Sequence, residues 1–168
     1  MSMNFETKEE FLAARKEFFE SHPEAKEAKT VGVLNLIMKR EYAEQIVKGT
    51  KKLEFRSYSP HYVKRLIDPD VADYISRHLK DEEVLTFCND IRQVARIHFH
   101  NYNNSWFLDV KCTFNDVFQV NDNDVKMLQD TYGCHDFDED LRILNASNEE
   151  RRPWVFYFVC GEVLDTNL

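Results

Sequence analysis

The strongest strand of this chain is predicted at Trp154-Val-Phe-Tyr-Phe-Val-Cys-Gly-Glu-Val-Leu164. Aromatic and β-branched residues dominate this segment, and such residues fit the pleated, half-buried surface of a sheet. Its position late in the chain indicates that it closes the sheet. Shorter apolar or alternating segments predict five further strands, at residues 31–37, 52–58, 83–89, 93–102 and 106–114.

Capping residues and apolar spacing predict helices between these strands. Thr7 and Glu10 form a capping-box pattern that starts the first helix. Gly49 stands where the left-handed residue after a helix belongs. Ser59-Pro60 and Asp68-Pro69 each combine an N-cap residue with a proline at the first helical position. The predicted helices cover residues 7–20, 39–48, a short stretch from 60, 69–80, 121–132 and 138–144.

The order of these elements predicts the fold class. Six strands with inserted helices do not alternate as regular strand–helix–strand units, so an α+β fold with a small, mostly antiparallel, barrel-like sheet is favoured. A polar connector around Pro23 separates the first helix from the rest. Residues 1–30 are therefore predicted to be an N-terminal helical extension, and residues 31–168 the main domain.

Charge is distributed unevenly along the 168 residues. The net charge is −8, but residues 31–66 carry eight basic against three acidic side chains. A surface that coats duplex DNA without specificity makes a domain basic, so that function is not expected. A local basic patch in an acidic chain is better suited to a small anionic ligand or a few phosphates.

Several function classes are not expected from the sequence. No apolar run has the length of a membrane span or a signal peptide. The four cysteines form no Cys-x-x-Cys pair, which favours reduced thiols and a cytoplasmic protein. No glycine-rich phosphate loop is present, so no cofactor is expected.

His98 and His100 share one face of a strand and, with Cys134-His135-Asp136, could hold a metal. Histidines without a metal are the favoured alternative, and no metal site is expected.

The segment with the most concentrated chemistry is Gly49-Thr50-Lys51-Lys52-Leu53-Glu54-Phe55-Arg56, which links a predicted helix to a predicted strand. The two-residue period of a strand places Glu54 and Arg56 on the same side. Arginine offers a rigid fork of donors for phosphate or carboxylate oxygens. Lys51, beside the turn, can reach into a cleft. The alternative is an ion pair on a solvated face, which contributes little.

The order strand, short helix and Gly-x-Lys-x-x-Glu-x-Arg resembles the signature of the ASCH domain, a branch of the PUA-like superfamily. The resemblance covers residues 31–163. It implies a small pseudo-barrel with a cleft beside the helix that follows the first strand. Such domains are thought to bind RNA or modified nucleotides, and the motif places Lys51, Glu54 and Arg56 in the cleft. Tyr58, just after the motif, could stack on a base; packing is the alternative.

The sequence patterns and the resemblance to the ASCH signature together lead to three candidate functions. The favoured one is binding of single-stranded RNA, a nucleoside or a nucleotide in a small basic cleft. The second is an amidohydrolase acting on N4-acylated cytidine or a related amide, because one bacterial branch of the family is similar to small amidohydrolases that remove the acetyl group from N4-acetylcytidine. That branch uses a threonine three residues after the lysine, where this chain has Glu54, so Lys51 and Glu54 would be catalytic, with Glu54 as the base for water. The third is a protein-interaction module built from the first helix and the acidic region.

Overall fold

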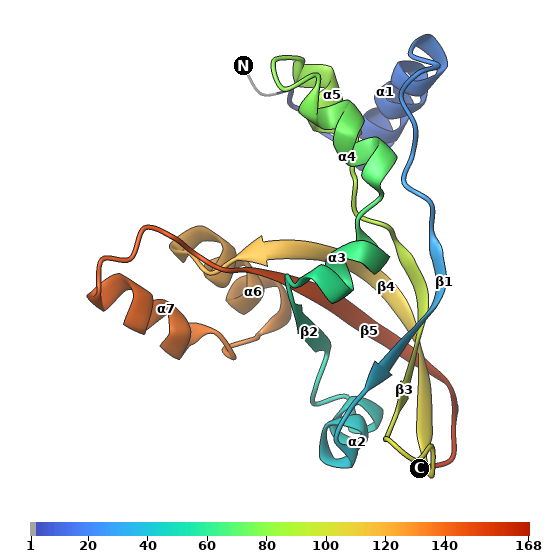
Figure 1. Ribbon diagram of the computed structural model, residues 1–168, viewed down its shortest axis with the longest axis vertical. Helices are drawn as coiled ribbons and strands as arrows, with labels where there is room; N and C mark the ends of the chain where they lie inside the picture. Colours follow the sequence, from blue (N-terminus) through green and yellow to red (C-terminus); the bar gives the residue numbers. More distant parts are fainter. Residues whose placement is uncertain (1–2) are drawn as a thin grey trace. The chain divides into compact units, whose positions relative to one another are not determined.

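The computed structural model describes residues 3–168, which form an α+β fold (Figure 1). Contacts between Cα atoms divide the chain into two compact units. The first contains the residues before Val31 and residues 63–92, and the second contains residues 31–62 and 93–168. The assignment of residues 1–30 and 31–168 to separate domains stays a prediction. The elements are α1 Lys8–Ser21, β1 Val31–Ile37, α2 Arg40–Lys48, β2 Leu53–Ser57, α3 Pro60–Leu66, α4 Pro69–Ser76, α5 Glu82–Phe87, β3 Val94–His100, β4 Phe107–Gln119, α6 Asp122–Tyr132, α7 Asp138–Ala146 and β5 Trp154–Thr166.

A five-stranded sheet in the order β1-β3-β4-β5-β2 forms the second unit. Strand β1 pairs with β3 in parallel, and the other three pairings are antiparallel. The prediction of a mostly antiparallel sheet in an α+β fold is therefore confirmed. The predicted closing strand, β5, lies between β4 and β2, while β1 and β2 are the two edge strands.

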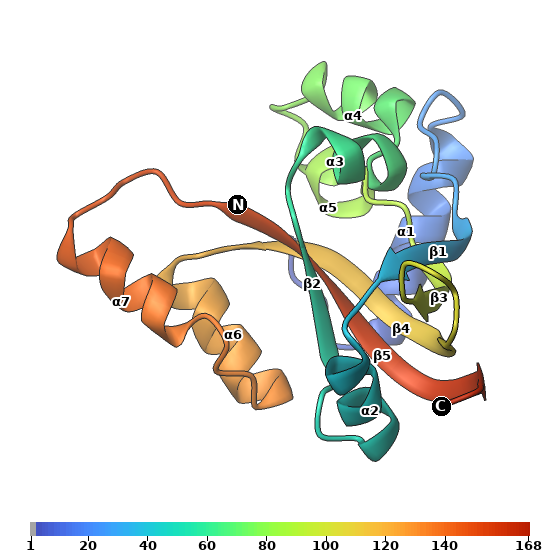
Figure 2. The same ribbon diagram turned by 60° about the horizontal axis from the view of Figure 1, so that its bottom comes forward.

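The sheet is curled into an open half-barrel (Figures 1 and 2). Strands β4 and β5 are the longest, with 13 residues each. Their register shifts three times between Asp109 and Phe114, and shifts of this kind bend a strand and increase its twist. The curl brings the two edge strands toward each other.

Helices α6 and α7 pack together beside the C-terminal end of β4 and the N-terminal end of β5 (Figure 2). Asn121 caps α6 by accepting a hydrogen bond from the Asp124 N–H at 2.8 Å, as expected for a residue of this type before a helix. The predictions of helices at 121–132 and 138–144 are confirmed. The core between these helices and the sheet contains Leu53, Phe118, Val120, Val125, Leu128 and Tyr157.

Helices α1, α4 and α5 form the first unit around the buried rings of Phe18, Tyr74 and Phe87. The predicted strand at 83–89 is wrong, because this segment is helix α5. Asp81 accepts hydrogen bonds from the Glu83 and Val84 N–H groups and so starts a helix. Burial of Val84 and Phe87, three residues apart, follows the helical period.

No helix within residues 3–168 combines the length and the apolar character that crossing a membrane requires.

Candidate functional site

A tight turn after α2 places the residues of the motif. The helix ends at Gly49, which has a φ of 79° and donates its N–H to the Ile46 carbonyl. The next two N–H groups, of Thr50 and Lys51, both reach the Gln45 carbonyl, at 3.0 and 3.2 Å. The turn therefore fixes the backbone of Lys51 immediately beside the helix end.

We expect Gly49→Ala to lower the free energy of unfolding by about 1 kcal/mol, because a Cβ disfavours the left-handed backbone conformation. The matched control is Gly32→Ala in β1, where φ is not positive and an added Cβ meets no atom within 4 Å. The control should leave stability unchanged or raise it slightly. Urea denaturation measures both, and equal effects of the two substitutions would contradict the proposed role of the turn.

Glu54 is the buried centre of the motif. Its Oε1 atom lies 3.0 Å from Arg56 Nη1 and 4.0 Å from Lys51 Nζ. The same oxygen accepts the Phe55 N–H at 2.8 Å. Only 9% of the Glu54 side chain is exposed, so these partners are needed to compensate its buried negative charge. The three residues that the sequence singles out thus meet at one carboxylate.

Arg56 is held by backbone as well as by Glu54. Its Nη1 donates to the Phe55 carbonyl at 2.8 Å, and its Nη2 donates to the Ile37 carbonyl at 2.9 Å. Because Ile37 ends β1 and Arg56 belongs to β2, this side chain links the two edge strands of the half-barrel. Its donors are largely occupied by the protein itself, which gives Arg56 a structural role.

Lys51 differs from Arg56 in its surroundings. Its ammonium lies 5.8 Å from the centre of the Tyr42 ring and 5.9 Å from that of Phe55. Glu54 at 4.0 Å is beyond hydrogen-bond length, although only 16% of the Lys51 side chain is exposed. Among the described residues, Glu54 is the only acid within ion-pair distance of it. Lys51 thus keeps donors available for a ligand.

The cluster carries an excess positive charge. Lys51 and Arg56 are two cations that share the single carboxylate of Glu54. The neighbouring thiol of Cys160 does not offset this charge, since burial, and secondly the charge of Glu54, raise its pKa to about 12. Buried charges in proteins are normally paired, so an anionic ligand would complete this cluster.

A pocket of about 770 Å³ opens beside this turn. One wall consists of Tyr42 and Gln45 from α2 and of residues 50–53, including Lys51. The opposite wall consists of residues 132–136, from the end of α6 to the turn before α7. The volume lies in the range of small-molecule sites. The lining is mostly polar, with two tyrosine rings, Tyr42 and Tyr132.

Comparison with protein-family models, with curated proteins and with solved structures found no match. The resemblance to the ASCH signature therefore stays a prediction, carried by the residues of the motif alone.

Not all of the predicted site residues belong to the pocket. Lys51 lines it, whereas Glu54 and Arg56 lie behind Lys51 and are absent from its wall. Tyr58 stacks on Phe156 with ring centres 5.0 Å apart and is also outside the pocket lining. Glu54 accepts from the Phe55 N–H and pairs with Arg56, while the Lys51 ammonium lies 4.0 Å away. The amidohydrolase alternative stays a prediction.

The opposite wall is the part of the pocket that sequence reasoning missed. Tyr132 belongs to a predicted acidic helix, and Cys134-His135-Asp136 is considered in the sequence only as a possible source of metal ligands. The one local indication in the sequence is Gly133, a residue type that commonly ends helices. Gly133 ends α6 with a φ of 64°, and the chain turns there into the pocket wall. No pattern in the sequence predicts that this turn faces Lys51.

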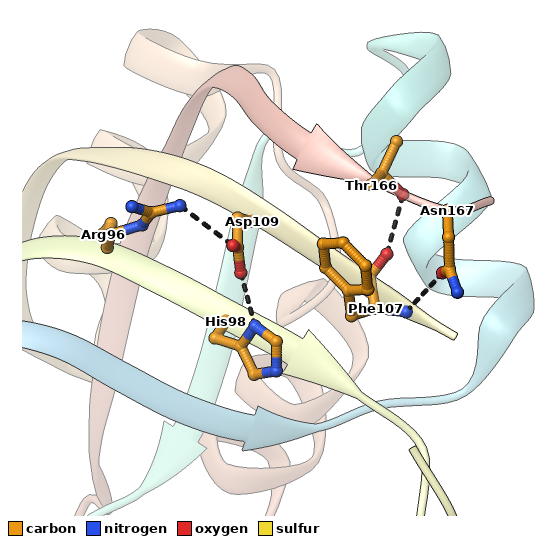
Figure 3. Close-up of polar contacts among 6 residues, drawn as sticks. All are labelled: Arg96, His98, Phe107, Asp109, Thr166 and Asn167. Carbon is orange, nitrogen blue, oxygen red and sulfur yellow. Dashed lines mark hydrogen bonds and ion pairs between the residues drawn. The ribbon is translucent and has the colours of Figure 1, made fainter. Parts of the chain in front are cut away.

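His98 and His100 are engaged within the protein. The ring of His98 contacts Asp109, which also receives Arg96 Nη2 at 2.9 Å (Figure 3). Nearby, Thr166 and Asn167 hydrogen-bond to the backbone of Phe107. His100 contacts the Asn101 carbonyl through Nδ1. Within residues 3–168 no three His, Cys, Asp or Glu side chains are grouped to hold a metal ion.

Proposed function

We propose that this chain is an ASCH-type domain of the PUA-like superfamily that binds RNA or a nucleotide-like ligand in the pocket beside α2. Lys51 would bind a phosphate or another anionic group of the ligand. Glu54 and Arg56 would hold Lys51 in place from behind. The observation that carries the proposal is a nearly buried cation, with donors available, on the wall of a pocket of ligand size.

Aromatic side chains of the same pocket support a ligand with a planar base. Tyr42 and Tyr132 line the two walls. Unpaired bases are commonly held by stacking on such rings, while cations hold the phosphate. The Gln45 side chain on the α2 wall offers an amide that could pair with a base edge. The pocket thus contains rings and an amide for a base and a cation for a phosphate.

We expect Lys51→Ala to weaken binding about 10- to 100-fold, the usual effect of losing a charge-assisted hydrogen bond. Binding is measured by NMR titration with the four nucleosides, their 5′-monophosphates and a single-stranded RNA pentanucleotide. The matched control is Lys48→Ala, an exposed lysine of the same helix end that is not part of the pocket wall. The control should change affinity less than about threefold, which is the range of a screened surface charge.

Two outcomes would contradict the proposal. One is that none of these ligands shifts the signals of Tyr42, Lys51 or Gly133. The other is that Lys51→Ala and Lys48→Ala weaken binding equally, since the contact would then depend on general surface charge. Cys134 offers an independent readout, because its partly exposed thiol lines the pocket. Its alkylation should slow when the ligand is bound.

A further inference from the structure

The two walls of the pocket have opposite charge. The first wall contains two lysines, Lys51 and Lys52, and no acid. The second wall contains one acid, Asp136, and the segment that continues from it, residues 137–150, contains five more acidic residues and a single arginine. A ligand bound to Lys51 therefore shares the pocket with the negative charge of Asp136.

Asp136 is the acid of this segment that lines the pocket. Its side chain is exposed and forms no ion pair with any of residues 3–168. The neighbouring Asp138 is different, because Gln129 Nε2 at 2.7 Å and His135 Nδ1 at 2.9 Å hold its two oxygens. Asp136 thus presents an unpaired negative charge to whatever occupies the pocket.

The Cys134 thiol shows that these charges act on the same small region. Burial raises the pKa of this thiol, the charges of Asp136 and Asp138 raise it further, and the charge of Lys51 lowers it. Lys51 and Asp136 line the same pocket as Cys134, and their charges act on its thiol in opposite directions. A second phosphate on the ligand would lie within the same range, because charges are screened only over about 8 Å at physiological salt.

We propose that the turn between α6 and α7 acts as a charge filter that admits a ligand with a single phosphate and rejects polyphosphates and RNA strands. This inference rests on the proposed function and narrows its ligand to a nucleoside monophosphate. The pocket lining contains two lysines, Lys51 and Lys52, and one acid, Asp136, so its net charge matches one phosphate. Each further phosphate adds negative charge beside Asp136, and the lining contains no third lysine or arginine to compensate it. The pocket volume of about 770 Å³ is also of the size that holds a single small molecule.

The test compares Kd values for 5′-monophosphates, 5′-triphosphates and a single-stranded RNA pentanucleotide in three proteins: the unchanged chain, Asp136→Asn and Asp140→Asn. Asp140 is the matched control, because it is an exposed aspartate of the same segment outside the pocket wall. We expect the unchanged protein to bind a monophosphate at least about tenfold more tightly than the other two ligands. Asp136→Asn should reduce this ratio about threefold or more, and Asp140→Asn should leave it nearly unchanged, since it lies farther from the bound phosphates.

The outcomes separate this inference from the function on which it rests. If the pentanucleotide or the triphosphate binds as tightly as the monophosphate, the filter is overturned while nucleotide binding stands. The filter is also overturned if Asp136→Asn leaves the ratio unchanged. If no nucleotide of any length binds, the proposed function itself fails. A reduced ratio for Asp136→Asn alone, with binding dependent on Lys51, supports both.

Discussion

Glu54→Ala should lower the free energy of unfolding by about 3–5 kcal/mol, the range for removing one member of a buried ion pair. The substitution leaves the cations of Lys51 and Arg56 together in a nearly buried site, with 16% and 17% of their side chains exposed. It also removes the acceptor of the Phe55 N–H, which is 2.8 Å from Glu54 Oε1. Charge repulsion and an unpaired donor then act in the same direction.

Urea denaturation monitored by tryptophan fluorescence measures this change, and thermal unfolding should show a fall of about 10 °C for a chain of this length. The matched control is Glu44→Ala, which breaks the exposed pair between Glu44 and Arg40 at 3.1 Å. Exposed pairs of this spacing contribute only about 0.3–0.5 kcal/mol. A Glu54→Ala effect as small as that of the control would show that the cluster is solvated rather than buried.

Arg56→Met should cost about 2–4 kcal/mol of unfolding free energy, because methionine fills similar space but supplies no charge or donor. Glu54 would retain only Lys51, at 4.0 Å, as a charged partner. The Ile37 carbonyl would lose the donor that links β1 to β2. The expected loss is smaller than for Glu54→Ala, since one cation still faces the carboxylate.

The control for Arg56→Met is Arg96→Met, which removes the 2.9 Å contact with Asp109 from a side chain that is 39% exposed. That substitution should cost about 1 kcal/mol or less. A double mutant of Glu54→Ala and Arg56→Met should be more stable than the sum of the single losses predicts, because the two side chains share one interaction. Additive losses would contradict the direct coupling of Glu54 and Arg56.

Local patterns in the sequence were sufficient for most elements of the fold. Thr7, Gly49 and Asp68 mark helix ends through capping chemistry that involves only neighbouring residues, and the structure confirms each of them. The segment 83–89 was predicted wrongly because Val84-Leu85-Thr86-Phe87 has the composition of a strand. The cap at Asp81 and the burial of Phe87 against Phe18, with ring centres 5.4 Å apart, favour the helix instead.

The candidate site was predictable only where it depends on local spacing. The two-residue period of a strand correctly predicts that Glu54 and Arg56 share a side, and their ion pair confirms it. The contact of Arg56 with Ile37 and the acidic second wall of the pocket were not predictable, because each depends on how distant segments meet in the folded sheet. The parallel pairing of β1 with β3 has the same origin.

The pairing of β2 with β5 has a consequence for how the protein is made. Within residues 3–168, β5 is the only sheet neighbour of β2, and Glu54 lies opposite Phe158 in that ladder. On the ribosome, therefore, a nascent chain exposes the apolar side chains of Leu53 and Phe55 until residues 154–166 have been translated. Such non-local pairing slows folding and leaves strand edges open to wrong partners. Charged residues in and beside β2 would keep this unpaired segment from aggregating before its partner strand emerges. They are Lys51, Lys52, Glu54 and Arg56, which water solvates in the nascent chain.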